Sequence, residues 1–129
     1  MTDILIKRFF ELDAQGKPSP DGQQYLPAGE SMGVTSLGMN ITKLPPHRLE
    51  PCNRGKHTNQ QEEVYIVLDG HGVIQADGYN WQIGPGMLIR VGPGQERKFV
   101  SGTKGLTILT MSAIQGNNST DLSYQTSAL

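Results

Sequence analysis

The chain has 129 residues, a formal net charge of −1 at pH 7 and one cysteine. This length suffices for one domain with a hydrophobic core, and the charge excludes the basic surface of a typical nucleic-acid-binding protein. One cysteine excludes an intrachain disulfide framework, and no apolar stretch approaches the roughly 20 residues that cross a bilayer. The N-terminus also lacks the apolar core of a signal peptide, so we expect a cytoplasmic protein without nucleic-acid or membrane partners.

Short apolar runs separated by glycine and proline predict an all-β protein. The 16 glycines and 8 prolines interrupt most windows long enough for an amphipathic helix, and apolar residues tend to alternate instead. Asp77-Gly78 predicts a two-residue hairpin, and Asp69-Gly70 and Pro93-Gly94 predict further turns. Regularly spaced short strands are typical of a sandwich or barrel. In chain order, we expect strands at residues 4–10, 34–44, 56–59, 64–68, 72–76, 79–83, 87–91, 97–100 and 106–111.

The chain divides into three predicted parts. Residues 1–33 are an N-terminal extension, in which a strand is followed by a polar loop rich in glycine and proline. Residues 34–114 are the β-barrel, and residues 115–129 are a polar tail that we expect to be poorly ordered. The exposed apolar strand 4–10 suggests pairing or exchange between two copies, so we expect a homodimer.

Two tracts in the centre of the chain carry the candidate site. The first runs from His57 to Gly70 and ends in QEEVYIVLDG, with six residues between Glu63 and Gly70. Strand alternation places His57 and Asn59 on one face, toward the barrel interior. The second tract, GPGMLIRVGPGQER at residues 84–97, combines turn glycines and prolines with a terminal Arg97.

Together the two tracts resemble the signature of the cupin superfamily, a His-x-His, Glu, Gly block followed by a Gly, Pro-x-Gly, His block. The resemblance covers about residues 44–111 and extends to small bacterial cupins that also carry arginine at the last position. It implies a cupin jelly-roll β-barrel (a double-stranded β-helix), here with an extra N-terminal strand, and often a dimer. The superfamily hosts isomerases, dioxygenases, decarboxylases, lyases and non-enzymatic binders, so the fold does not select an activity.

The metal-ligand positions of metal-binding cupins are poorly matched. In the family, two histidines and the glutamate coordinate a divalent ion together with a histidine of the second block. The family motif has either three or four residues between its second ligand and its glutamate. With three, the first-block positions in this chain are His57, Asn59 and Glu63; with four, they are Lys56, Thr58 and Glu63. Neither alignment supplies two histidines.

Arg97 stands where the family has its last metal-binding histidine, and a guanidinium cannot ligate a cation. We therefore expect no metal cofactor. The alternative is Fe, Mn, Ni or Zn held by His57, Asn59 and Glu63, with His47 supplied from a loop. His71, which follows a predicted turn, is expected to face solvent.

Arg97 itself has two interpretations, and both place it inside the barrel. It binds an anionic ligand through its planar fork, or it pairs with Glu63 or Glu62 as a buried bridge in place of a metal. The bridge is slightly favoured, because an interior glutamate without a metal needs a partner. Tyr65 and Phe99 follow Glu63 and Arg97 by two residues, which is the repeat of a strand. They should therefore share the interior face, either as the lining of a pocket or as ordinary core.

We therefore predict a protein that binds a small anionic metabolite of the sugar acid or sugar phosphate type. The expected ligand-binding residues are Arg97, Glu63, His57, Tyr65 and Phe99. The alternatives are a metal-dependent dioxygenase, isomerase or lyase that uses His57 and Glu63, a metal-free isomerase with the same two residues as the catalytic proton-transfer pair, and an interaction protein whose barrel is filled by side chains.

Overall fold

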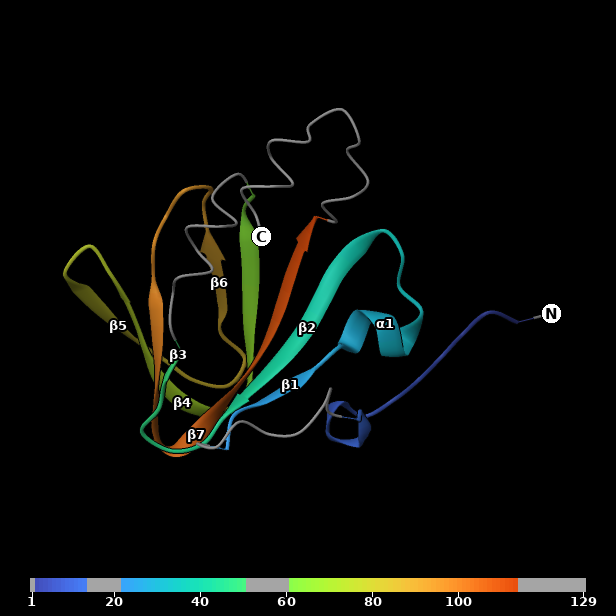
Figure 1. Ribbon diagram of the computed structural model, residues 1–129, viewed down its shortest axis with the longest axis horizontal. Coiled ribbons are helices and arrows are strands. Elements are labelled where there is room, and N and C mark those ends of the chain that lie inside the picture. Colours follow the sequence, from blue (N-terminus) through green and yellow to red (C-terminus); the bar gives the residue numbers. More distant parts are fainter. Residues whose placement is uncertain (1, 14–21, 51–60, 114–129) are drawn as a thin grey trace.

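The computed structural model describes residues 2–13, 22–50 and 61–113, and these form an all-β structure with few helical residues (Figure 1). All strand pairs within these ranges are antiparallel. The strand order is β1-β2-β7-β4-β5, with β3 added to β7 and β6 added to β4. The elements are η1 (Phe9–Glu11), β1 (Gln24–Leu26), α1 (Ala28–Met32), β2 (Leu37–Leu44), β3 (Leu49–Glu50), β4 (Glu63–Ala76), β5 (Tyr79–Ile83), β6 (Leu88–Val91) and β7 (Lys98–Ala113).

The two long strands β4 and β7 wrap the sheet into a barrel. The first half of β4 pairs with the second half of β7, from Glu63 opposite Ser112, and the second half of β4 pairs with the first half of β7, to Gln75 opposite Lys98. Both strands bend at the lower end of the view in Figure 1. We call this bend the closed end of the barrel, and the opposite end, where β4 and β7 each begin, the barrel mouth.

Glycines permit the bend at the closed end. Gly70 has a φ of 77°, and a Cβ at this position would collide with the carbonyl oxygen of Gly105. Gly105 has a φ of 76°, and its own Cβ would lie 2.6 Å from the carbonyl oxygen of Leu44. Both residues therefore need the freedom at positive φ and the small volume that glycine alone provides.

The bend corrects two boundaries expected from the sequence. Asp69-Gly70 does not separate two strands, because β4 continues through it with irregular register at Val67/Asp69 and Gly70/Gly72. Likewise, the predicted strands 97–100 and 106–111 are parts of the single strand β7. A bulge with a positive-φ glycine bends a strand without ending it, and the sequence signal is the same as for a turn.

The hairpin predicted at Asp77-Gly78 is confirmed. Both residues have positive φ, 53° and 81°, and the flanking pair is Ala76 opposite Tyr79. This is the type I′ geometry, whose twist matches that of the two strands. The predicted strand 79–83 has the bounds of β5, and the predicted strands 34–44 and 87–91 correspond to β2 and β6. The strand expected at residues 56–59 lies outside the described residues.

The predicted N-terminal strand 4–10 is wrong. Residues 2–8 have no regular secondary structure and lead into η1, and the side chains of Ile4, Leu5 and Ile6 are exposed. The extra N-terminal strand is instead β1, in the stretch expected to be a loop, and it pairs with β2. Phe9 and Leu12 pack on a small apolar cluster around Leu26, Ala28 and Ile41. The N-terminal segment 2–13 is thus held by these side-chain contacts and not by strand pairing.

The main hydrophobic core fills the barrel. Its members are mostly aliphatic, and Leu106 and Val67 are the most completely buried. The core consists of Leu44, Tyr65, Val67, Ile74, Ile83, Val91, Phe99, Leu106 and Ile108, with Ile89 packed against it. No helix in the described parts of the chain is long and apolar enough to span a bilayer.

Candidate functional site

The candidate site lies just inside the barrel mouth, between residues far apart in sequence. Glu63 is the first residue of β4, and Arg97 directly precedes β7. Because β4 and β7 both bend, their two halves face each other, and Arg97 reaches across the interior to form an ion pair with Glu63. The predicted bridge between these two residues is thus present.

Tyr65 completes a compact network with this pair. Its hydroxyl donates to Oε1 of Glu63 at 2.5 Å and accepts from Nε of Arg97 at 3.2 Å. Nη2 of Arg97 donates to Oε1 of Glu63 and to the same hydroxyl, and Nη1 donates to the carbonyl oxygen of Gln95 at 3.1 Å. Among the described residues, Oε1 accepts both bonds to Glu63 and Oε2 accepts none.

The network is shielded from water by aromatic rings. The Arg97 side chain is 8% exposed and that of Glu63 is 13% exposed. The guanidinium carbon of Arg97 lies 5.5 Å from the centre of the Tyr65 ring, whose centre is 4.8 Å from that of Phe99. The prediction that Tyr65 and Phe99 share the interior face is confirmed, and both belong to the main core. A charge pair in such surroundings is weakly screened by solvent.

A second Glu–Arg pair provides an exposed counterpart on the neighbouring residue. Glu62, the alternative predicted partner of Arg97, instead binds Nε of Arg90 with an N–O distance of 2.7 Å. The side chains of Glu62 and Arg90 are 57% and 64% exposed. Strand alternation therefore sends adjacent glutamates to opposite environments, one in solvent and one in the barrel.

Burial raises the pKa of Tyr65 above its ordinary value, and the negative charge of Glu63 raises it further. The phenol is thus neutral at physiological pH and remains a hydrogen-bond donor to Glu63. A chemical role for Tyr65 would accordingly be that of a proton or hydrogen-bond donor, not a base.

The shifted pKa predicts a specific loss of stability in alkali. A raised folded-state pKa contributes stability that is complete below the unfolded pKa of about 10 and is lost as pH rises toward the folded value. We expect the free energy of unfolding to fall by about 1.4 kcal/mol per pH unit in this window through Tyr65 alone. Urea unfolding of the wild type and Tyr65→Phe across the window measures this contribution as a difference in slope. Equal slopes would contradict the assignment.

The structure separates His47 from Glu63, the other proposed metal ligand among the described residues. His47 is exposed and donates its backbone N–H to the carbonyl oxygen of Gly102 at 3.2 Å, beside the bend of β7. It therefore lies at the closed end, whereas Glu63 lies at the mouth. His71 also lies at the closed end, where it is exposed as predicted but sits within β4 and contacts Thr103 at 3.2 Å. His47 is thus no partner for Glu63 in a metal site.

His57 and Asn59, the other predicted ligands, lie outside the described residues. Within residues 2–13, 22–50 and 61–113, no group of three or more His, Cys, Asp or Glu side chains is placed to hold a metal ion. The described donor set fits a cation poorly, because the carboxylate that a metal would need is paired with a guanidinium that would repel the metal.

A groove at the mouth was not anticipated from the sequence. It has a volume of about 370 Å³ and lies between the β4–β5 hairpin and the loop before β7. Nε2 of Gln95 joins the two sides by donating to Oδ2 of Asp77 at 3.2 Å. The sequence predicts the hairpin itself. The approach of the hairpin to the loop before β7, however, depends on the bend of β7. The lining residues are Gln75, Ala76, Asp77, Gly78, Tyr79, Asn80, Glu96, Arg97 and Lys98.

Solved structures of similar fold include proteins of several kinds. One is a sugar phosphate isomerase of the cupin superfamily from Silicibacter pomeroyi, with 21% identity, a TM-score of 0.62, and coverage of 74% of this chain and 61% of that one. Another is the polyketide cyclase RemF from Streptomyces resistomycificus, with 19% identity, a TM-score of 0.65, and coverage of 84% and 80%. The cupin domain of Cnp3 from Schizosaccharomyces pombe has 10% identity, a TM-score of 0.66, and coverage of 96% and 77%.

These likenesses establish the jelly-roll fold and leave the activity open, since each identity is below a quarter. The chain spans about three fifths of the length of the isomerase. A search of curated protein sequences gave no match. The family described as "Cupin domain" matches residues 40–112, which is more than half of the chain and includes Glu63, Tyr65 and Arg97. The chain therefore belongs to the cupin family.

Proposed function

We propose that this cupin binds a small anionic metabolite, of the sugar acid or sugar phosphate type, at the barrel mouth and without a full metal site. The observation that carries the proposal is the buried guanidinium of Arg97, which lies just inside the mouth and also lines the groove there. An arginine fork matches the geometry of a carboxylate or phosphate and holds it through paired hydrogen bonds.

The network supports exchange of one anion for another. Two neutral acceptors, the hydroxyl of Tyr65 and the carbonyl oxygen of Gln95, hold Nε and Nη1 of Arg97 independently of Glu63. The guanidinium thus stays in place if a ligand carboxylate or phosphate takes over from Glu63 at Nη2. Glu63 would then be the anion that the ligand replaces, and it keeps the guanidinium of Arg97 paired until the ligand binds.

The surroundings favour a small polar ligand. The residues that line the groove next to Arg97 include Gln75, Asn80, Glu96 and Lys98, which carry amide, carboxylate and ammonium groups of the kind that bond to hydroxyl groups. The sugar phosphate isomerase among the structural neighbours acts on a molecule of this class, and we extend that class to this chain as part of the proposal.

Thermal unfolding with a panel of sugar acids and sugar phosphates tests the binding function. A ligand that binds only the folded state stabilises it by about 2.7 kcal/mol at 100 times its dissociation constant, so the melting temperature rises. We expect at least one member to raise the melting temperature of the wild type and of Arg90→Lys. The same ligand should have a much smaller effect on Arg97→Lys, which retains the charge but loses the fork.

Each variant is compared with its own ligand-free melting temperature, so a loss of basal stability does not mimic a loss of binding. Shifts of equal size in Arg97→Lys and Arg90→Lys would refute an anion site at Arg97. If no member of the panel shifts the wild type, the proposed ligand class is wrong.

A further inference from the structure

The site around Arg97 carries more negative than positive formal charge. The residues that line the groove include two cations, Arg97 and Lys98, and two carboxylates, Asp77 and Glu96, so these charges cancel. Glu63 adds a third carboxylate just inside the mouth. With two positive and three negative groups, the described site has a formal charge of −1 before a ligand binds. A ligand with one negative charge therefore meets less repulsion here than a ligand with two.

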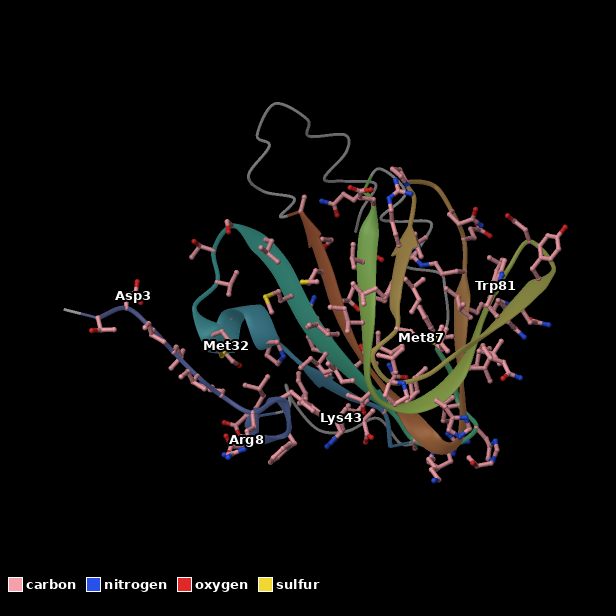
Figure 2. All side chains as sticks on the ribbon, turned by 180° about the vertical axis from the view of Figure 1, so that it is seen from behind. Asp3, Arg8, Met32, Lys43, Trp81 and Met87 are labelled. Atoms are coloured by element: carbon pink, nitrogen blue, oxygen red, sulfur yellow. The ribbon has the colours of Figure 1, made fainter. Side chains whose placement is uncertain are left out.

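Other cations of the described chain do not add to Arg97 inside the mouth. Arg97 is buried on the interior face, so strand alternation directs the exposed side chain of the next residue, Lys98, to the other face. Arg8 and Lys43 lie away from the hairpin that borders the groove, which is marked by Trp81 in Figure 2. Among the described residues, Arg97 is the only buried cation.

The ligand inherits few hydrogen-bond donors from Glu63. Oε1 of Glu63 accepts from Nη2 of Arg97 and from the hydroxyl of Tyr65. Nε and Nη1 of Arg97 are already bonded to that hydroxyl and to the carbonyl oxygen of Gln95. A ligand carboxylate with one oxygen at the position of Oε1 takes over both donors. A phosphate monoester brings three terminal oxygens to the same two donors, and a buried acceptor without a partner costs free energy.

A phosphate monoester also brings more charge than a carboxylate. At pH 7 it carries about −1.5 to −2, whereas an ionised carboxylate carries −1. The side chains of Arg97 and Glu63 are both largely buried, beside the ring of Tyr65, so the additional charge is weakly screened. Exchange of one carboxylate for another thus matches both the charge and the donors that the guanidinium already serves.

We propose that the site selects sugar acids over sugar phosphates, with the ligand carboxylate at Nη2 of Arg97 and at the hydroxyl of Tyr65 in place of Glu63. This inference rests on the proposed function, because it specifies which of the two anion classes binds there. The hydroxyl groups of the sugar then extend toward the polar residues of the groove. The ligand class differs from that named for the sugar phosphate isomerase, with which this chain shares the fold at 21% identity.

The selectivity originates in Glu63 and not in Arg97. A guanidinium by itself binds carboxylates and phosphates alike. Glu63 begins β4 and stays close to the guanidinium after the exchange, so its carboxylate repels a second negative charge on the ligand. Removal of the charge at Glu63 should therefore relax the selectivity, whereas removal of the exposed charge at Glu62 should not.

Isothermal titration calorimetry with matched pairs of sugars tests the selectivity. In each pair the same hexose carries either a carboxylate at C6 or a phosphate on O6. D-Glucuronate and D-glucose 6-phosphate are one pair, and the galactose and mannose analogues are the others. At about pH 7.5, where the phosphates are mainly dianionic, the wild type should bind the acid of at least one pair at least about tenfold more tightly than the phosphate.

Two variants locate the origin of the preference. Glu63→Gln keeps the shape of the side chain but removes its charge, and it should narrow the preference to less than about threefold or reverse it. Glu62→Gln is the matched control at the adjacent, exposed position and should keep the wild-type preference. Arg97→Lys should weaken the binding of the preferred acid.

A ligand variant uses the wild type alone and keeps the test valid if Glu63→Gln fails to fold. The methyl diesters of the same sugar phosphates carry one negative charge and one terminal oxygen fewer than the monoesters. They should bind at least about threefold more tightly than the monoesters.

The possible failures of this inference and of the proposed function are distinct. Sugar phosphates that bind the wild type as tightly as the matched acids, and lose affinity in Arg97→Lys, would overturn the selectivity but support an anion site. A full preference for acids in Glu63→Gln, or methyl diesters no tighter than monoesters, would overturn the role of charge at Glu63. Absence of binding by every acid and every phosphate would refute the proposed function, and the selectivity with it.

Discussion

Replacing Arg97 by methionine is expected to lower the free energy of unfolding by about 3–5 kcal/mol. Methionine fills much of the same space, so the main loss is electrostatic. The substitution leaves the carboxylate of Glu63, 13% exposed, without its cation inside a barrel lined by aromatic rings. Urea unfolding near neutral pH measures the effect.

The chain supplies a matched control one residue away. Glu62, directly before β4, and Arg90 of β6 form an ion pair of good geometry whose side chains are exposed to solvent. Because water screens this pair and its side chains give up conformational freedom, Arg90→Met should cost less than about 1 kcal/mol. Equal losses in Arg97→Met and Arg90→Met would contradict the buried pair.

The double variant Glu63→Leu/Arg97→Met separates the penalty of an unpaired charge from the net value of the pair. Removing both charges eliminates the desolvation cost of each, so we expect the double variant to be clearly more stable than Arg97→Met alone. A pair retained at a net cost in stability is better explained by binding than by folding, which is why this comparison bears on function.

Gly70→Ala is expected to destabilise the protein by at least about 3 kcal/mol. Two effects combine: an L-residue is disfavoured at a φ of 77°, and its Cβ would collide with the carbonyl oxygen of Gly105 across the bend. The bend is what brings the two halves of β4 and β7 face to face. We therefore expect Gly70→Ala also to weaken ligand binding at the mouth.

Gly78→Ala is the control that isolates the collision. Gly78 has a similar φ of 81°, but a Cβ there would meet no atom within 4 Å among the described residues beyond its chain neighbours. Its cost should be limited to the backbone term of about 1–2 kcal/mol. If urea unfolding gives the same loss for the two variants, the close approach of Gly70 to Gly105 does not constrain the barrel.

Much of the site could be predicted because strand alternation is a local property. The two-residue spacing places Glu63 and Tyr65 on the same face of one strand, and Arg97 and Phe99 on the same face of another. A buried carboxylate needs a partner, which favours Arg97 as the partner of Glu63. The hairpin at Asp77-Gly78 follows equally from its two residues. The face of each side chain and the conformation of the turn depend on neighbouring residues in the sequence, whereas the choice of Arg97 rests on the chemistry of a residue 34 positions away.

The errors arise where distant segments decide the outcome. Asp69-Gly70 has the sequence of a turn, but its role as a bend depends on Gly105 in another strand. The position of His47 at the closed end depends on how the sheet wraps, and the sequence around it carries no such information. The apolar run at Ile4–Ile6 resembles a strand, yet no partner strand lies within reach in the described chain.

Metal content tests most directly whether Arg97 takes the place of a metal ion just inside the barrel mouth. The contrasting assignment, a cupin enzyme that holds Fe, Mn, Ni or Zn with His57 and Glu63, requires Glu63 to release Arg97 and bind a cation beside a guanidinium. After growth with added metals, elemental analysis of the purified protein should give less than about a tenth of an equivalent of any of the four. Close to one equivalent, lost in Glu63→Gln, would contradict the account.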